Sequence, residues 1–325
     1  MKTFYFKPLA AHLSIVSMGT ADFGCDKSIK DPEAFALLDA YIENGGNLID
    51  TAHMYADWEG GERCSSERAI GRWVRARGNR EKVYIASKGA HPDLGTMDVP
   101  RVNPEAITHD IDEGLLISGL DYFDIYYLHR DDPRRPVGPI MECLHTQIQK
   151  GKIRAIGASN WQSSRIAEAN AYARANGLQG FTASQIQFSA AEPNRLPEAD
   201  TTLLSMDKTE HDFYMRENML VTAFTSQAKG YLSKKAAGLA LSEGTRQQYD
   251  SAINDRLLVF VKAIAAKHNV SVTTVCLAYI WSQGFPGIPV LGCHHLAHLA
   301  DSMADCDFVL TGEETALINA AKFRA

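Results

Sequence analysis

The chain has 325 residues, 45% of them apolar, and a formal net charge of -6 at pH 7. This length suffices for one large core or for two ordinary domains. Lys and Arg are not concentrated in any stretch, so the charge pattern argues against nucleic acid and anionic membranes as partners.

The cysteines and the N-terminus indicate the compartment. The six cysteines are scattered without a C-x-x-C pair, which is typical of reduced thiols in a reducing environment. Lys7, Pro8 and His12 interrupt the apolar residues near the N-terminus, so a signal peptide is not predicted. No apolar run reaches the about 18 residues of a membrane-spanning helix. We therefore expect a cytoplasmic protein without a membrane segment.

Short apolar runs alternate with segments of helical periodicity along the whole chain. The runs are Ser14–Thr20, Asn47–Ala52, Val83–Lys88, Tyr122–His129, Ile153–Ser159, Phe181–Ser189, Leu220–Ser226 and Gly287–Cys293. Most are apolar throughout, as expected of parallel strands covered on both faces. Eight alternations predict an α/β fold, a single (β/α)8 or TIM barrel forming one domain over residues 1–325.

The segments between the runs carry helix-capping residues. Asp31 and Asn103 each precede a proline, which predicts a capping side chain just before the first helical position. Ser271 is expected to begin another helix, with Val275 and Tyr279 on its buried face.

Two regions depart from the alternation. Lys2–Leu13 is expected to form a short hairpin across the barrel floor, and Ala228–Ile253 is a polar insertion after the seventh strand. A doubly wound open sheet is the alternative fold, but it needs a glycine-rich fingerprint after an early strand. The turn Gly19–Gly24 lacks the G-x-G-x-x-G pattern, so the barrel is favoured.

Four titratable residues follow neighbouring strands of the predicted barrel. Active sites in this fold form where the strands end at the carboxyl face. Asp50, Lys88 and His129 close the second, third and fourth strands, and Tyr55 follows Asp50 on the loop above. An ammonium stabilises a phenolate, so Lys88 would lower the pKa of Tyr55 and make it a usable acid. Asp50 would keep Lys88 charged, and His129 would orient a carbonyl.

Several segments resemble the aldo-keto reductases. They are Asp50-Thr51-Ala52 with Tyr55, Ser87-Lys88, Tyr127-Leu128-His129, Gly151–Asn160, Ser184–Gln187 and Val221–Phe224. The resemblance covers nearly the whole chain, in order. It implies an NAD(P)-dependent oxidoreductase that reduces an aldehyde or ketone to an alcohol, or the reverse. Tyr55 would be the general acid or base, tuned by Lys88 and Asp50.

The same resemblance implies a set of cofactor-binding residues. Ser159, Asn160 and Gln185 would hydrogen-bond the nicotinamide carboxamide. Phe224 would stack on its ring, where the family commonly has tyrosine. The residues expected beside the pyrophosphate, in place of the family's Ser-Pro-Leu, are Thr225, Ser226 and Gln227.

The segment after the eighth strand departs from the family pattern. Relatives that prefer NADP often carry Gly-x-Arg there, and the arginine grips the adenosine 2′-phosphate. Here Gly292 is followed by Cys293 and His294, with His298 one turn later. Neutral histidine binds phosphate less well than a guanidinium does, so the cofactor is NADP or NAD without a predicted preference. An arginine from the insertion Ala228–Ile253 is the alternative phosphate ligand.

The same histidines allow a metal hypothesis. His294 and His298 form an i, i+4 pair next to His295 that could ligate zinc if helical. Catalytic metal barrels usually draw their ligands from several strands, so no metal site is predicted.

Two other functions stay open. A Schiff-base aldolase also uses a barrel lysine, but it needs that lysine neutral, and Asp50 would keep Lys88 charged. A non-catalytic nicotinamide-binding regulatory subunit is the second, because some relatives serve as channel subunits. The four intact titratable residues favour catalysis.

The substrate is predicted only by class. By their positions in loops, Phe23, Trp58, Arg130 and Trp161 could line the pocket, and such walls suit polar carbonyl compounds or sugar-like molecules. The two tryptophans could instead pack the loops. The sequence predicts neither the physiological substrate nor the oligomeric state.

Overall fold

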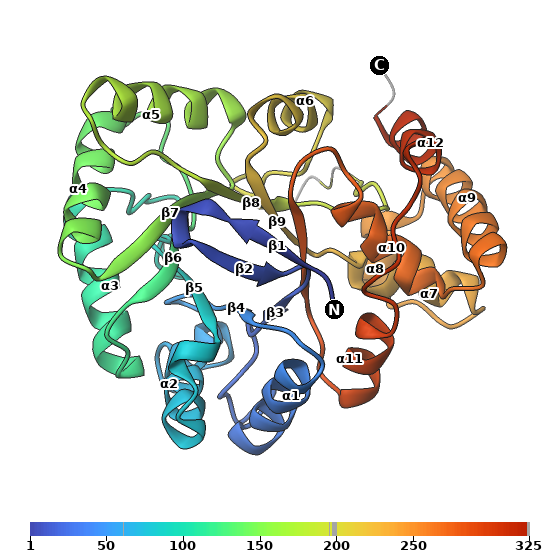
Figure 1. Cartoon of the computed structure of the whole chain (residues 1–325), viewed down its shortest axis with the longest axis horizontal. Coiled ribbons are helices and arrows are strands. Elements are labelled where there is room, and N and C mark those ends of the chain that lie inside the picture. Colours follow the sequence, from blue (N-terminus) through green and yellow to red (C-terminus); the bar gives the residue numbers. More distant parts are fainter. Residues whose placement is uncertain (61, 195, 197–199, 324–325) are drawn as a thin grey trace.

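Eight parallel strands close into a barrel that is ringed by helices (Figure 1). The computed structural model describes residues 1–60, 62–194, 196 and 200–323. The strands pair in the order β10-β3-β4-β5-β6-β7-β8-β9, which confirms the predicted (β/α)8 TIM barrel. They are β3 (Ser17–Gly19), β4 (Leu48–Asp50), β5 (Tyr84–Gly89), β6 (Phe123–Leu128), β7 (Ile153–Ser159), β8 (Ala183–Gln187), β9 (Leu220–Phe224) and β10 (Gly287–Leu291).

The helices cover the outer face of the barrel. All six residues of β6 are buried, because the barrel interior covers one of its faces and helices cover the other. No helix in the described part of the chain is both long enough and apolar enough to cross a membrane. The helices are α1 (Asp31–Glu43), α2 (Ser65–Arg77), α3 (Pro104–Ser118), α4 (Val137–Gln149), α5 (Ser163–Ala175), α6 (Lys208–Glu217), α7 (Tyr231–Ala236), α8 (Glu243–Tyr249), α9 (Ala252–His268), α10 (Val272–Trp281), α11 (Leu296–Met303) and α12 (Gly312–Lys322).

Most strands are shorter than their apolar runs. The predicted strand Leu220–Ser226 ends at Phe224, because Thr225 has a φ of 51°, which no β ladder accepts. The predicted strand Ser14–Thr20 contributes only its last half to the barrel. Ser14 instead ends the second strand of the N-terminal hairpin.

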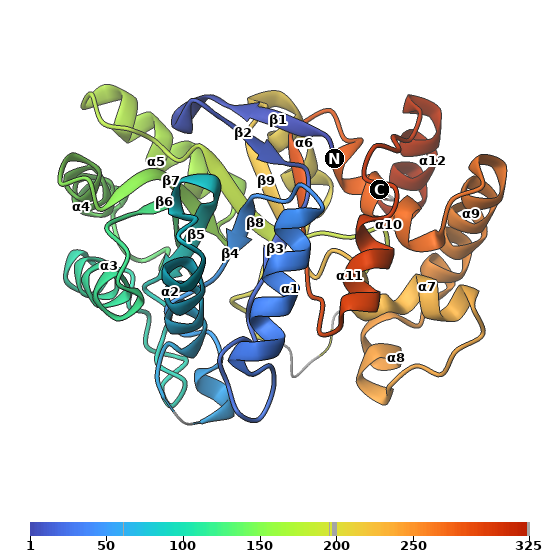
Figure 2. The same ribbon diagram turned by 60° about the horizontal axis from the view of Figure 1, so that its bottom comes forward.

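The N-terminal hairpin closes one end of the barrel, as Figure 2 shows. Phe6, Leu9 and Leu13 are buried in one apolar cluster with inward-facing residues of the barrel strands, including Leu48 and Ile125. This confirms the predicted hairpin and leaves the opposite, carboxyl end of the strands for a site. Its antiparallel strands are β1 (Thr3–Phe6) and β2 (Ala11–Ser14).

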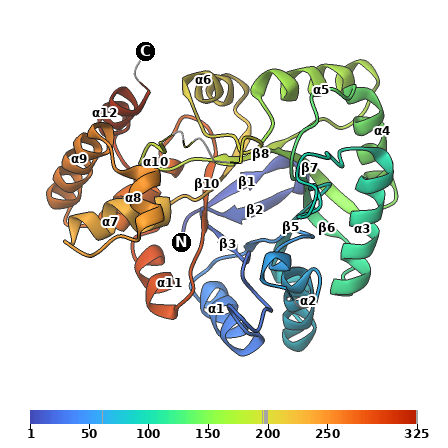
Figure 3. The ribbon, with the colours of Figure 1, turned by 180° about the vertical axis from the view of Figure 1, so that it is seen from behind.

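The insertion after β9 is folded rather than merely polar. It forms α7 and α8, and Figure 3 shows both beside α9 and α10. Tyr231, Leu232 and Tyr249 are buried, and the two tyrosine rings lie 5.7 Å apart. These buried side chains and the packing of α7 on α9 and α10 fix the insertion in place, so its basic residues have defined positions.

Two of the three predicted helix caps are confirmed. The side chains of Asn103 and Ser271 accept backbone N–H bonds at the starts of α3 and α10. The prediction for Asp31 is wrong, because α1 begins at Asp31 itself and Lys30 is the residue before it. The Asp31 carboxylate is bound by Arg72 through two bonds of 2.6 and 2.8 Å, which occupy both oxygens.

Candidate active site

The four predicted titratable residues meet at the carboxyl end of the barrel strands. The Nζ of Lys88 donates to Asp50 Oδ2 at 2.8 Å and to the Tyr55 hydroxyl at 2.9 Å. The rings of Tyr55 and His129 lie edge to face at 5.7 Å between centroids. Lys88 is fully buried and Tyr55 is half-buried, so the phenol is the member of the group that faces outward.

The register of three neighbouring strands brings these residues together. Asp50 pairs with Ala86 on β5, and Lys88 pairs with Tyr127 on β6, so the strand ends lie at one level. Gly89 follows Lys88, and a Cβ there would clash with the hydroxyl of Tyr126. The close packing of Tyr126 therefore favours glycine next to Lys88.

The charges favour an ammonium bound to a neutral phenol. Burial raises the pKa of Tyr55 above its usual value, and Lys88 opposes that rise. Burial disfavours the charged form of Lys88, yet Asp50 and Tyr55 raise the pKa of Lys88 above its usual value. The predicted net lowering of the Tyr55 pKa is therefore wrong, because lost hydration outweighs Lys88. Lys88 still makes the phenolate less costly than in the same buried phenol without an ammonium.

His129 presents a neutral imidazole. Burial lowers the pKa of His129 well below its usual value, and the neighbouring His91, Arg130 and Lys88 add to this. Among the described residues its buried Nδ1 has no hydrogen-bond partner. A neutral imidazole carries one N–H, so His129 has donor capacity that the protein itself does not use.

Two residues of the predicted carboxamide site are tied to the four titratable residues. Gln185 Nε2 donates to Asp50 Oδ1 at 2.7 Å and to Thr222 Oγ1 at 3.1 Å. Asn160 Nδ2 donates to the His129 carbonyl at 3.2 Å and to Ser159 Oγ at 3.1 Å. Ser159, Asn160 and Gln185 therefore lie beside Asp50 and His129, at the ends of β7 and β8.

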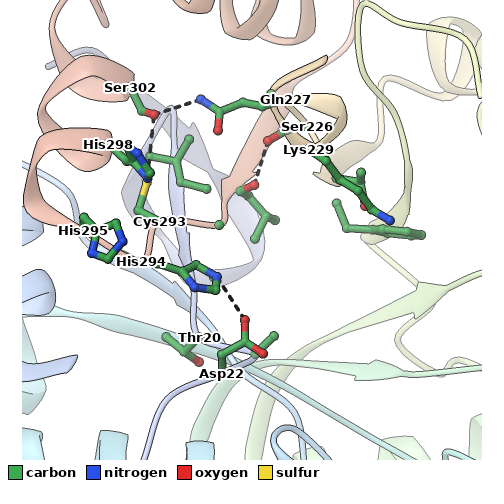
Figure 4. Close-up of a pocket in the computed structure, with 18 of the residues that line it drawn as sticks. Thr20, Asp22, Ser226, Gln227, Lys229, Cys293, His294, His295, His298 and Ser302 are labelled. Carbon is green, nitrogen blue, oxygen red and sulfur yellow. Dashed lines mark hydrogen bonds and ion pairs between the residues drawn. The ribbon is translucent and has the colours of Figure 1, made fainter. Parts of the chain in front are cut away.

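A cavity of about 890 Å³ begins at Asp50 and Tyr55 and reaches α11 (Figure 4). Its volume is within the about 300–1,000 Å³ of typical ligand sites. Lys229 and Lys234 from the insertion also line it. The sequence predicted no lysine here, since only the folding of the insertion brings these residues to the cavity. The predicted cofactor-binding residues that line it are Phe224, Thr225, Ser226, Gln227, Gly292, His294 and His298.

Several polar side chains of this cavity are already bound to the protein. Ser226 Oγ donates to the Val290 carbonyl at 2.7 Å, and Gln227 Nε2 donates to Ser302 Oγ at 2.8 Å. His294 Nε2 lies 3.2 Å from Asp22 Oδ2, a pair visible in Figure 4. The hydrogen bond with Asp22 raises the pKa of His294. A phosphate at His294 would thus compete with a carboxylate.

Sequence reasoning missed a buried charged pair behind Lys88. His53 Nδ1 lies 3.2 Å from Glu67 Oε2, and Glu67 Oε1 accepts a 2.5 Å bond from the hydroxyl of Ser87. Although burial opposes it, contacts with Cys64 and Glu67 raise the pKa of His53 to about 11. The pair fastens α2 to β5 beside Lys88. Only the position of His53 soon after Asp50 hinted at a role.

Within the described residues, two side-chain groups come within metal-ligand reach of one another. They are His53, His109 and Glu113, and His53, Cys64 and Glu67. The three histidines after β10 do not form such a group, although the rings of His295 and His298 lie 5.2 Å apart.

The predicted substrate-pocket residues separate into two kinds. Trp161 is buried and donates its Nε1 to the Arg130 carbonyl at 2.9 Å, so it packs the loop. Trp58 is 45% exposed, and its ring lies 6.0 Å from the Tyr55 ring. Phe23 lines the large cavity. Trp58 and Phe23 therefore remain beside the site, and Trp161 supports it from behind.

Comparison with known proteins identifies the family. A sequence model of the aldo/keto reductase family matches residues 16–322. Aldo-keto reductase ausK of Aspergillus calidoustus is 30% identical over 317 residues, which cover 93% of this chain and 75% of the relative. Norsolorinic acid reductase stcV of Emericella nidulans is 28% identical over 326 residues, covering 94% and 78%.

Two further comparisons extend the match. The aryl-alcohol dehydrogenase (NADP(+)) of Phanerodontia chrysosporium is 26% identical over 338 residues, covering 95% of this chain and 82% of the relative. A crystal structure of a thermostable aldo-keto reductase with the inhibitor epalrestat superposes with a TM-score of 0.71 at 20% identity, covering 99% and 100% of the two chains. That likeness supports the barrel fold. The chain belongs to the aldo/keto reductase family.

Proposed function

We propose that this chain is an NAD(P)H-dependent oxidoreductase that reduces an aldehyde or ketone to an alcohol, or catalyses the reverse. The observation that carries the proposal is the Lys88 ammonium, which binds Asp50 at 2.8 Å and the Tyr55 hydroxyl at 2.9 Å. Family membership supports the nicotinamide cofactor, and the names of the relatives support carbonyl chemistry.

We propose a role for each of the four residues. A bound nicotinamide would supply the hydride for the carbonyl carbon. Tyr55 would donate its proton to the carbonyl oxygen, and Lys88 would stabilise the phenolate that remains. The unused N–H of the neutral His129 would hold the same oxygen. Asp50 would keep the ammonium charged and in place. In alcohol oxidation, the Tyr55 phenolate would accept the proton instead.

A dinucleotide would extend along this cavity from Asp50 and Tyr55 to α11. Ser159, Asn160 and Gln185 adjoin Asp50 and His129, where the carboxamide would bind. Phe224 is half-buried at the end of β9 and offers an aromatic face for the ring. Thr225, Ser226 and Gln227 would adjoin the pyrophosphate. The N-terminus of α11 borders the far end, and a helix N-terminus favours an anionic group.

The choice between NADP and NAD depends on the far end of this cavity. His294 stands at the position of the family arginine but is paired with Asp22. We expect weaker discrimination in favour of NADP than in relatives with arginine. The NADP affinity relative to NAD should rise as pH falls and His294 becomes protonated, and the hydrogen bond with Asp22 raises the pKa of His294. Dissociation constants for both cofactors at pH 6 and pH 8 measure this.

The substitution His294→Arg should shift the preference toward NADP by about 1–3 kcal/mol, the scale of a good charged hydrogen bond. His295→Arg serves as the matched control, because it adds the same charge one residue away. The insertion supplies alternative ligands for the 2′-phosphate, since Lys229 and Lys234 line the cavity. A strong, pH-independent NADP preference that is lost in Lys234→Met would contradict the placement of the 2′-phosphate at His294.

A Schiff-base aldolase is the alternative use of Lys88. The raised pKa and the 2.8 Å bond to Asp50 hold the lysine in its unreactive, charged form. We expect borohydride reduction in the presence of carbonyl substrates to leave Lys88 unmodified. Peptide mass spectrometry checks this, and a reduced imine mapped to Lys88 would support the aldolase.

Cofactor absorbance tests the proposed function. Purified protein should oxidise NADH or NADPH in the presence of at least one member of a panel of aromatic aldehydes, ketones and aldoses. The names of the relatives make aromatic aldehydes the first group to test. Tight cofactor binding without oxidation across the panel would favour the non-catalytic regulatory subunit.

A further inference from the structure

A buried arginine follows His129 at the catalytic end of the barrel. Arg130 is 7% exposed, and its Nη2 lies 3.2 Å from Asp200 Oδ2. Its Nε donates to Thr202 Oγ1 at 2.8 Å, and its Nη1 donates to the His129 carbonyl at 3.0 Å. These contacts join the strand end that carries His129 to the loop after β8.

The charge of Arg130 acts on the reacting groups. It lowers the pKa of His129 and of His91, and it opposes the rise in the pKa of Tyr55. The Nη1 of Arg130 bonds the His129 carbonyl, and the His129 ring lies 5.7 Å from the Tyr55 ring. The guanidinium is therefore a close neighbour of the two residues that would hold a carbonyl oxygen. A second group on a substrate bound there would lie near Arg130.

The contacts that Arg130 makes do not fully compensate the guanidinium for the water that it loses on burial. Burial lowers the pKa of Arg130 below its usual value even though Asp200 raises it. The carboxylate partners of Arg101 and Arg165 outweigh burial, and the pKa of each of these arginines is raised. Among the described residues, Asp200 is the one carboxylate that pairs with Arg130, so this buried cation has a single and partly exposed anionic partner. A further anion would add to that pairing.

Arg130 also retains hydrogen-bonding capacity. A guanidinium has five N–H groups. The three bonds to described residues use one N–H from each nitrogen and leave one on each terminal nitrogen. Two N–H groups on one planar fork match the two oxygens of a carboxylate.

We propose that Arg130 binds a carboxylate of the carbonyl substrate and so directs the enzyme toward acidic aldehydes or ketones. This specificity rests on the proposed reductase function. Asp200 is the resident counter-ion and is more exposed than Arg130, with 30% of its side chain accessible. One substrate carboxylate can share the guanidinium with Asp200 or replace it. A phosphate dianion carries twice the charge of a carboxylate, so Asp200 would repel it more strongly. A carboxylate is therefore the favoured ligand.

The test compares matched acids and esters. The three isomers of carboxybenzaldehyde and their methyl esters vary the distance between the carbonyl and the acid. We expect at least one acid to exceed its ester in kcat/KM by about tenfold, the scale of one charged hydrogen bond. Arg130→Met should abolish this acid preference while changing the ester much less. Glyceraldehyde 3-phosphate against glyceraldehyde forms the phosphate arm, and no comparable preference is expected there.

Two variants separate anion binding from loop support. Asp200→Asn removes the counter-ion and keeps the guanidinium, so the acid preference should persist or increase. Arg165→Met removes an arginine of α5 that also pairs with a carboxylate, that of Asp131, and it should not alter the preference. If Arg130→Met and Asp200→Asn impair acids and esters equally, Arg130 only fastens the loop and the proposal fails.

A binding measurement distinguishes failure of this inference from failure of the proposed function. Benzoate is titrated into the protein–NADPH complex and followed by cofactor fluorescence. Binding that weakens about tenfold or more in Arg130→Met supports the anion site even if no aldehyde in the panel is reduced. Reduction of esters without acid preference and without benzoate binding overturns the inference and leaves the reductase function standing.

Discussion

Replacing Tyr55 with Phe is expected to reduce turnover by about 10²–10⁴-fold, the usual scale for loss of a general acid. The substitution removes the hydroxyl that Lys88 binds at 2.9 Å and little else. Cofactor affinity should stay close to that of the unmodified protein, because the cavity extends well beyond Tyr55. Single-turnover absorbance and a cofactor titration measure the two quantities separately.

Tyr126→Phe is the matched control for this substitution. Tyr126 is buried on β6 near the site, and among the described residues its hydroxyl has no hydrogen-bond partner. Loss of that hydroxyl should leave turnover nearly unchanged. If Tyr55→Phe retains near-normal turnover on a substrate whose chemical step limits the rate, Tyr55 does not donate the proton.

The second large effect is expected for Lys88→Met. Asp50 would lose its ion-pair partner in a site where it is only 3% exposed. Breaking a buried ion pair in this way costs about 3–5 kcal/mol of unfolding free energy. Turnover should also fall, because no ammonium remains to stabilise the Tyr55 phenolate. Urea unfolding and single-turnover kinetics measure the two losses.

The double variant Lys88→Met/Asp50→Asn separates stability from catalysis. It leaves no uncompensated charge, so much of the unfolding free energy should return, while turnover should stay low. Gln185, which donates to Asp50, can still donate to the asparagine oxygen. A double variant with normal turnover would show that Lys88 matters only for folding.

The barrel and the four titratable residues could be predicted from the sequence for one physical reason. Parallel strands that pair in register bring their carboxyl ends to one level, so Asp50, Lys88 and His129 must lie together once the strands are recognised. The strand ends were less predictable. The bounds of β7, Ile153–Ser159, were predicted correctly, but at Thr225 a positive φ ends β9 although the local residue types do not require it.

The features that could not be predicted from the sequence are contacts between distant segments of the chain. Arg130 meets Asp200 across 70 residues of chain, and Lys234 reaches the cavity because α7 packs on α9 and α10. No spacing rule connects such positions. The sign of the Tyr55 pKa shift was also beyond the sequence. It depends on how much water the folded site excludes, and this burial outweighs the neighbouring ammonium.

Direct transfer of deuterium tests the central claim most directly. The protein is incubated with NADH or NADPH that carries deuterium at the transferable position, together with an aldehyde from the active panel. Our account predicts one deuterium on the carbinol carbon of the alcohol for each cofactor oxidised, detected by mass spectrometry. Alcohol without deuterium, or cofactor that binds and is never oxidised, would contradict a nicotinamide-dependent carbonyl reductase.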